Sequence, residues 1–138
     1  MPKRFSFKGY YKDWFFRSLK ELSFVLTCEK NGQKWEGAET PRFTVTYTDL
    51  YGRQRHHYPD LFVDNHIVVE VKPAKHQRGK LVQLKAKAMT EFCNKHNYVY
   101  MMVSPRRIPK DKLKELFLSG SIKILDEYIP AFKRYLGL

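Results

Sequence analysis

Two short apolar runs on either side of an Asp64-Asn65 turn constrain the fold of this chain more than any other feature. The first run closes the segment Gln54–Val63, the second is His66–Lys72, and both have the length and β-branched composition of strands. Side chains alternate between the two faces of a strand, so Glu70 and Lys72 share one face of the second run. A carboxylate and an ammonium in an otherwise apolar strand are costly unless they pair or serve a ligand. The segment therefore predicts a β-hairpin with a charged pair on one face.

The loop of this hairpin decides whether Asp60 joins the charged pair. Direct pairing of Asp60 with Glu70 requires a three-residue loop, 64–66, and Asp and Asn tolerate the left-handed conformation that such a loop needs. Directly opposite side chains have Cβ atoms about 4.5–5.5 Å apart, a separation at which two carboxylates can share one cation. A two-residue loop, Asp64-Asn65, would pair Asp60 with Val69 and send the two carboxylates to opposite faces. A shared site therefore predicts an odd loop length, or a bulge that restores the same parity.

Two carboxylates and a backbone carbonyl would make a hard, oxygen-only site. Such a site suits Mg²⁺ or Mn²⁺, which keeps several waters and completes its coordination with substrate phosphate. Lys72, on the same face, could steady the attacking water or the charge that grows on the phosphoryl oxygens. Glu21, on the shoulder of a predicted helix, could hold a second metal or the hydration shell of the first. The alternative for Asp60, Glu70 and Lys72 is a structural ion pair.

The remaining periodicities predict an α/β layer with a mixed sheet. A chain of 138 residues is long enough for one core and too short for two cores of independent stability. Residues 1–12 mix basic and aromatic side chains and predict an arm, and residues 104–138 predict a largely helical C-terminal extension. The run 98–103 is nearly all apolar, as expected of a strand covered on both faces. The predicted helices cover about 13–30, 81–95, 110–118 and the residues after Pro130, and the predicted strands cover 34–37, 43–48, 54–63, 66–72, 98–103 and 122–125.

The charge balance indicates a polyanionic partner. Lys and Arg number 26 against 14 Asp and Glu, which gives a formal net charge of +12. Such an excess raises the local concentration of polyanions and adds counterion release on binding them. Nucleic acid is the leading class of partner, and the alternative is a basic protein whose surplus charge serves solubility or docking onto an acidic protein.

Other features limit the compartment and the chemistry. No segment is long and apolar enough to cross a bilayer, and the N-terminus lacks the apolar run of a signal peptide, so a soluble intracellular protein is expected. Cys28 and Cys93 each fall in a helical pattern, which suits a reducing compartment. The histidines and cysteines lack the ligand spacing of a zinc site. One of His56 and His57 is a candidate phosphate contact, although a plain strand residue is the favoured interpretation.

At the hairpin residues the sequence resembles the PD-(D/E)XK nuclease superfamily, which has the restriction-endonuclease-like fold. Pro59-Asp60 matches the first half of its motif and Glu70-Val71-Lys72 matches the second. Arg17-Ser18-Leu19-Lys20-Glu21 is similar to the helix signature of branches that carry an extra acidic residue. The combined pattern resembles phage Holliday-junction resolvases of the endonuclease I type, endonuclease subunits of heteromeric transposases, and phage head-completion proteins with the same core. The resemblance covers about Arg17 to Lys87.

This resemblance implies a single nuclease domain whose core is a mixed β-sheet flanked by helices. It implies that Asp60 and Glu70 ligate one or two Mg²⁺ or Mn²⁺ ions, that the carbonyl of Val71 adds a third oxygen, and that Lys72 is the catalytic lysine. Glu21 is carried over as a further metal ligand, and the alternatives are a solvated glutamate or a pair with Arg17. The residues expected to contact nucleic acid lie on the first helix, in the basic loop after the second run, and on the helix that follows: Arg17, Lys75, Arg78, Lys80, Gln83 and Lys87.

The sequence thus predicts a Mg²⁺-dependent DNA endonuclease that hydrolyses phosphodiester bonds. Cutting would be structure-selective or weakly sequence-selective, because contacts to phosphate position a protein without reading bases. One chain presents one site, so cutting both strands would require a homodimer or a partner nuclease or transposase subunit. The resemblance implies a phage or mobile-element protein that acts in the cytoplasm of a bacterial host. The alternatives are a head-completion-like assembly protein that keeps the nuclease fold to bind DNA, and a basic RNA-binding or ribosome-associated protein.

Overall fold

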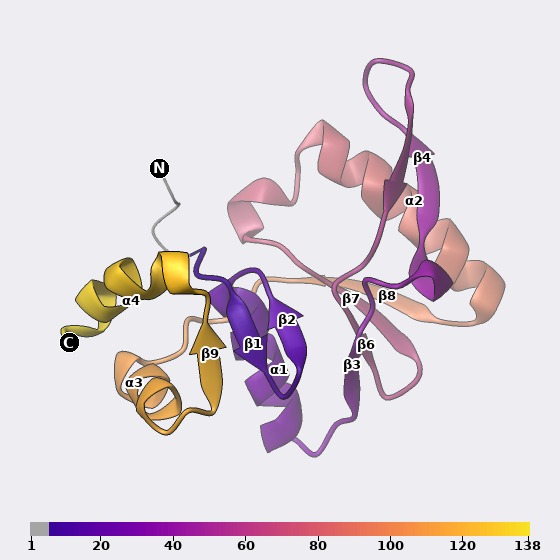
Figure 1. Cartoon of the computed structure of the whole chain (residues 1–138). Coiled ribbons are helices and arrows are strands. Elements are labelled where there is room, and N and C mark those ends of the chain that lie inside the picture. The colour runs from indigo at the N-terminus through magenta and orange to yellow at the C-terminus, as the bar shows by residue number, and fades with distance from the viewer. Residues whose placement is uncertain (1–5) are drawn as a thin grey trace. The chain divides into compact units, whose positions relative to one another are not determined.

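The computed structural model describes residues 6–138 and shows a mixed α/β chain, which confirms the predicted fold class (Figure 1). The described residues form two compact units. One consists of residues 6–26 and Pro105–Leu138, and the other of Thr27–Ser104. Among the described residues, no helix is long and apolar enough to cross a membrane.

The second unit is built on a four-stranded sheet with the order β3-β6-β7-β8. Neighbouring strands are antiparallel except for β7 and β8, which are parallel. Parallel neighbours need a crossover connection, and here the helix α2 provides it. These elements are β3 (Trp35–Gly37), β6 (Leu61–Val63), β7 (Ile67–Val71), α2 (Lys80–His96) and β8 (Val99–Val103).

The core of this unit lies between α2 and the sheet. Val68 of β7 and Phe62 of β6 are fully buried with Met89 and Cys93 of α2. The ring of Phe62 also lies 4.8 Å from that of Phe43, between centroids. Because side chains alternate along β7, the face that carries Val68 also carries Glu70. The helix α2 therefore covers the same face of the sheet as the predicted site.

The sequence was wrong about the coverage of β8. Val99 and Met101 are each 45% exposed, whereas a strand covered on both faces would bury them. The reason is that β8 is an edge strand of the four-stranded sheet. Only its alternate side chains, such as Tyr100, pack against the core beneath α2.

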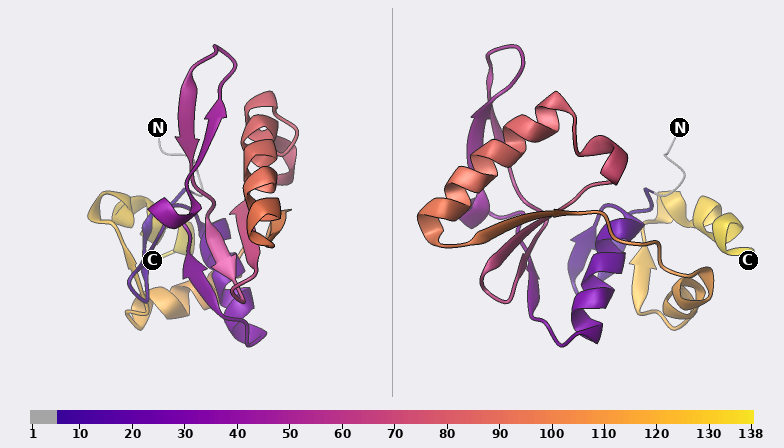
Figure 2. Two further views of the ribbon diagram at one scale, coloured as in Figure 1. Left: turned by 90° about the vertical axis from the view of Figure 1, so that its right-hand side faces the viewer. Right: turned by 180° about the vertical axis from the view of Figure 1, so that it is seen from behind.

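A separate two-stranded ribbon is formed by β4 (Val45–Thr48) and β5 (Gln54–His57). The sequence predicted one continuous strand over 54–63, but β5 and β6 are separated by 58–60. Pro59 cannot donate to a strand ladder, which accounts for the break. The ribbon packs against α2, and its loop projects beyond the side of that helix (Figures 1 and 2).

The first unit contains a three-stranded sheet with the order β2-β1-β9. The prediction that the first helix begins at about residue 13 was wrong, and so was the prediction that residues 6–12 belong to an arm. Residues 1–5 of the predicted arm lie outside the described residues. Lys12 and Asp13 have φ of 48° and 64° and form the two-residue turn between β1 and β2. The elements of this unit are β1 (Gly9–Tyr11), β2 (Trp14–Phe16), α1 (Leu19–Lys30, which ends in the second unit), α3 (Lys110–Leu118), β9 (Ile122–Ile124) and α4 (Ile129–Leu136).

The central strand of this sheet requires a glycine. A Cβ built at Gly9 would lie 2.2 Å from the backbone oxygen of Lys123, a separation that no packing can accept. Gly9 pairs with Ile124 at this point, so strands from opposite ends of the chain approach closely. The predicted C-terminal extension therefore supplies a strand as well as its two helices, and whether the chain is one domain stays a prediction.

Candidate metal and nucleic-acid site

The β6–β7 hairpin has the register that the sequence predicted. Leu61 pairs with Val69 and Val63 with Ile67, which leaves a three-residue loop, 64–66. Asp64 and Asn65 have φ of 52° and 54°, the left-handed conformation expected of such a loop. The predicted odd loop length is therefore confirmed, and the paired register ends at Leu61 and Val69, with Asp60 and Glu70 the next residue on each strand.

Asp60 is hydrogen-bonded to β7 through both its main chain and its side chain. Its N–H donates to the carbonyl oxygen of Val69 at 3.0 Å. Its Oδ2 accepts the N–H of Val71 at 2.7 Å. A hydrogen bond to an ionised acceptor is shorter and stronger than a neutral one. The carboxylate of Asp60 is thus held beside Val71, the residue whose carbonyl was predicted as a third ligand.

Glu70 is a buried carboxylate with an imidazole partner. The residue is 7% exposed, and its Oε1 contacts Nε2 of His57 at the end of β5. The sequence indicated His57 as a candidate phosphate contact and favoured a plain strand residue, so it missed this contact with Glu70. A glutamate in an apolar strand indicates that some partner is needed. The sequence could not identify His57 as that partner, because β5 and β7 are not hydrogen-bonded neighbours and only the folded unit brings them together.

Tyr100 is a second residue that the sequence missed. It lies on β8, where it pairs with Val68. Burial raises the pKa of the Tyr100 hydroxyl, and the negative charges of Glu70 and Asp60 raise it further. The phenol therefore stays neutral beside both carboxylates and can act as a hydrogen-bond donor or acceptor.

Lys72 directly follows β7 on the face that carries Glu70. Its N–H donates to the carbonyl oxygen of Val103 at 2.9 Å, and its own carbonyl oxygen accepts Nε2 of Gln77 at 3.0 Å. Gln83 of α2 in turn donates to the carbonyl of Gln77. These bonds tie the basic loop to both β7 and α2. The chain therefore passes from the predicted catalytic lysine into an ordered loop.

The residues predicted to bind nucleic acid in this unit are all exposed. They lie in the loop after β7 and in the first turns of α2, next to the ordered backbone around Gln77. Lys85, also on α2, is half-buried with its Nζ 5.9 Å from the centroid of the Tyr47 ring. The exposed set is Lys75, Arg78, Lys80, Gln83 and Lys87.

Glu21 and Arg17 belong to the first unit. Oε1 of Glu21 accepts the N–H of Arg17 at 3.2 Å, and Oε2 accepts the hydroxyl of Ser18 at 3.4 Å. The N–H of Glu21 donates back to Oγ of Ser18 at 3.3 Å. This reciprocal arrangement caps the N-terminus of α1 and is a structural role for the predicted signature. The metal-binding role of Glu21 and the DNA contact by Arg17, which is exposed, stay predictions.

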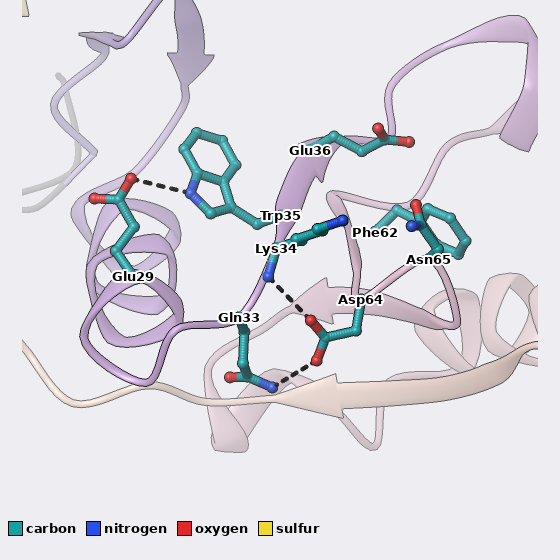
Figure 3. Close-up of a pocket in the computed structure, with 8 residues that line it drawn as sticks. All are labelled: Glu29, Gln33, Lys34, Trp35, Glu36, Phe62, Asp64 and Asn65. Carbon is teal, nitrogen blue, oxygen red and sulfur yellow. Dashed lines mark hydrogen bonds between the residues drawn. The ribbon is translucent and has the colours of Figure 1, made fainter.

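A pocket of about 370 Å³ lies at the opposite end of the hairpin, around its loop (Figure 3). Its polar groups bond one another: Oδ1 of Asp64 accepts the N–H of Lys34 at 3.0 Å, and Nε1 of Trp35 donates to Glu29 at 3.2 Å. These bonds join β3 to the loop and to the end of α1, so this pocket serves the fold. It is lined by Glu29, Gln33, Lys34, Trp35, Glu36, Phe62, Asp64 and Asn65.

Within residues 6–138, no three His, Cys, Asp or Glu side chains lie close enough to hold a metal between them. A cation at Asp60 and Glu70 would therefore complete its coordination with backbone, water or substrate oxygens. Comparisons with protein-family models, with curated proteins and with solved structures found no match for the chain.

Proposed function

We propose that this protein is a metal-dependent DNA endonuclease with a restriction-endonuclease-like core formed by β6, β7, α2 and β8. The observation that supports the proposal is the three-residue hairpin loop together with the hydrogen bonds of Asp60 to Val69 and Val71, the two neighbours of Glu70 on β7. Lys72 follows β7 at a position that shares the face of Glu70. The formal net charge of +12 supports a polyanionic substrate. A surface that only bound phosphate would gain nothing from two carboxylates, because they repel it.

Asp60 and Glu70 would hold Mg²⁺ or Mn²⁺, with the carbonyl of Val71 as a third oxygen. Mg²⁺ commonly binds through one or two carboxylates and keeps several waters, so two acidic side chains would be enough to hold it. When bound, such an ion polarises the phosphodiester and lowers the pKa of a water that it carries.

The chain's own residues would orient these groups. The N–H of Val71 holds the carboxylate of Asp60, and the imidazole of His57 fixes the rotamer of Glu70. His57 would therefore act as a positioning residue. The ammonium of Lys72 would stabilise the negative charge that develops on the phosphoryl oxygens. Since one chain carries one such site, a single copy would nick one strand, and a second copy or a partner nuclease subunit would cut the other.

Cleavage assays on branched, single-stranded and duplex DNA test this proposal. The wild-type protein should cut with Mg²⁺ or Mn²⁺ and stop in EDTA. Asp60→Asn and Glu70→Gln should abolish cutting while DNA affinity changes little. Asp64→Asn is the matched control, because it removes a carboxylate from the same hairpin at the loop and keeps an acceptor for the N–H of Lys34.

Two outcomes would overturn the proposal. Cutting that persists in Asp60→Asn and Glu70→Gln would remove both carboxylates from the mechanism. Tight DNA binding by the wild type without cutting in any divalent ion would favour the assembly protein that keeps the fold only to bind DNA.

A further inference from the structure

The loop of the β4–β5 ribbon presents an unusually exposed aromatic side chain. Tyr51 is 88% exposed and Leu50 beside it is 57% exposed, at the end of the ribbon that extends past α2 (Figure 2). Tyr51 has the largest exposed fraction among the exposed large hydrophobic residues of the described chain. Because the side chain of Tyr51 is exposed to water at the tip of the ribbon, it does not stabilise the hydrophobic core. It is therefore a candidate for a role in binding.

The loop that carries Tyr51 is stiffened by a single carboxylate. Oδ1 of Asp49 accepts the N–H groups of Tyr51 and Arg53, each at 2.9 Å, and Oδ2 accepts Nε of Arg55 at 3.0 Å. The backbone N–H of Arg53, followed by the side chain of Arg55, holds the pKa of Asp49 below its usual range, so the carboxylate stays ionised. Gly52 closes the turn with φ of 79° and donates to the carbonyl of Asp49 at 3.2 Å. A ligand of Tyr51 would therefore not have to order this loop.

The inner face of the ribbon connects this loop with the candidate metal site. Val45 pairs with His57 and Tyr47 with Arg55, so Tyr47, Arg55 and His57 share one face. At one end of this face His57 contacts Glu70, and near its middle Lys85 of α2 lies over the ring of Tyr47. The ring of Tyr47 also lies 6.5 Å from that of His57. The face therefore runs from the paired carboxylates to the loop and carries cationic groups along it.

The charges of the ribbon suit a nucleic acid. Asp49 is the only acidic residue in 45–57, its side chain is 8% exposed, and Arg55 neutralises it. Arg53, the last residue of the loop, and Arg55, on β5, are both exposed. An exposed aromatic ring among cations is how proteins hold single-stranded nucleic acid, because every base has a face on which the ring can stack.

We propose that Tyr51, with Leu50 beside it, stacks on an unpaired base of the DNA substrate. The inference rests on the proposed function and specifies its substrate class. In an intact duplex the faces of the bases are covered, so an aromatic wedge must first unstack them. The ribbon would therefore favour branched or single-stranded DNA. The four residue steps from Arg53 to His57 span about 13 Å, which corresponds to about four nucleotides at a spacing of about 3.4 Å along the strand.

Binding measurements without cleavage test this inference. Fluorescence anisotropy in EDTA would compare single-stranded, forked and duplex oligonucleotides. Tyr51→Ala should weaken binding to the single-stranded and forked DNA by about 5- to 100-fold and affect the duplex less, whereas Tyr51→Trp should retain binding. Leu50→Ala should also weaken binding, and Leu118→Ala is its matched control, since Leu118 is 66% exposed on α3 of the other unit. 2-Aminopurine would be placed at successive positions of the DNA strand. Its fluorescence should change when the wild-type protein binds and should stay unchanged when the Tyr51→Ala variant binds.

The outcomes separate this inference from the proposed function. Unchanged affinity of Tyr51→Ala for all three DNAs would overturn the inference even if the wild type cuts DNA. Tyr51-dependent binding without any cutting would uphold it and overturn the endonuclease. A loss of self-association in Tyr51→Ala, seen by sedimentation with DNA affinity unchanged, would instead assign the loop to a protein interface and overturn the inference.

Discussion

Removing the imidazole of His57 should destabilise the protein, because it would leave the carboxylate of Glu70 buried without its partner. The two side chains are 16% and 10% exposed, so little water can take the place of the ring. Leaving a buried polar group without its hydrogen-bond partner costs about 1–3 kcal/mol, and more for a charged group, so His57→Ala is expected to lose about 2–3 kcal/mol. Such a loss is a large fraction of the stability of a protein of this size, which is about 5–15 kcal/mol.

A double-mutant cycle in urea isolates the contribution of the pair. The free energies of unfolding of His57→Ala, Glu70→Ala and the double variant should give a coupling energy of about 1–3 kcal/mol, because Glu70→Ala removes the charge that His57→Ala leaves unpaired. The matched control is the ion pair of Arg42 with Glu36, in which N and O lie 3.5 Å apart and the side chains are 57% and 53% exposed. Exposed pairs contribute about 0.2–1 kcal/mol, so the control cycle should give the smaller coupling.

The reasoning would be refuted by a coupling energy for His57 and Glu70 no larger than that of the exposed pair. It would also be refuted if His57→Ala were as stable as the wild type. Either result would mean that Glu70 is solvated or finds another donor, and that His57 does not position it.

Three further outcomes are expected. Saturating Mn²⁺ should raise the unfolding temperature of the wild type, since a ligand that binds the native state stabilises that state. The Asp60→Asn variant should show no such rise. A rise of equal size in the variant and the wild type would exclude Asp60 as a ligand. Burial raises the thiol pKa of Cys28 and of Cys93 from 9.0 to about 11, so their contribution to stability is present below pH 9.0 and disappears as the pH rises through about 11. Ellman's reagent should therefore react slowly with the native chain at near-neutral pH, and reaction as fast as that of the unfolded chain would contradict the burial. Gly9→Ala should lower the free energy of unfolding by about 2 kcal/mol or more, because the added Cβ would lie 2.2 Å from the backbone oxygen of Lys123. A urea midpoint equal to that of the wild type would contradict this prediction, because it would show that β1 and β9 can move apart without cost.

The hairpin of the candidate site was predictable from sequence because its determinants are local. Alternation has a period of two residues, and Asp64 and Asn65 both tolerate φ above zero, so the strand faces and the position of the turn follow from neighbouring residues. The choice between a two- and a three-residue loop was settled only by the strand register. The helix α2 was placed within one residue at each end for the same kind of reason: its apolar positions recur on one face, and Asn97 ends it with φ of 59°.

The N-terminal hairpin was not predictable, because a distant strand completes it. The aromatic residues from Trp14 to Phe16 fit a helical pattern as well as a strand, and Asp13 suits a helix N-cap as well as a turn. Pairing of Gly9 with Ile124 resolves this ambiguity, and it joins residues from opposite ends of the chain. A local pattern carries no information about such a partner.

The sequence by itself determined that Glu70 and Lys72 occupy one face of a strand, since that depends only on alternation, and it predicted that Asp60 would join them through an odd-numbered loop. The tertiary structure alone decided which groups surround them. The crossover through α2 sets β8 parallel to β7 and so brings Tyr100 beside both carboxylates, and the break at Pro59 lets β5 leave the sheet and deliver His57 to Glu70. The first contact joins two strands that are linked only through the α2 crossover, and the second joins β5 to β7 across the intervening β6. The packing of the whole unit, rather than any local preference, stabilises both.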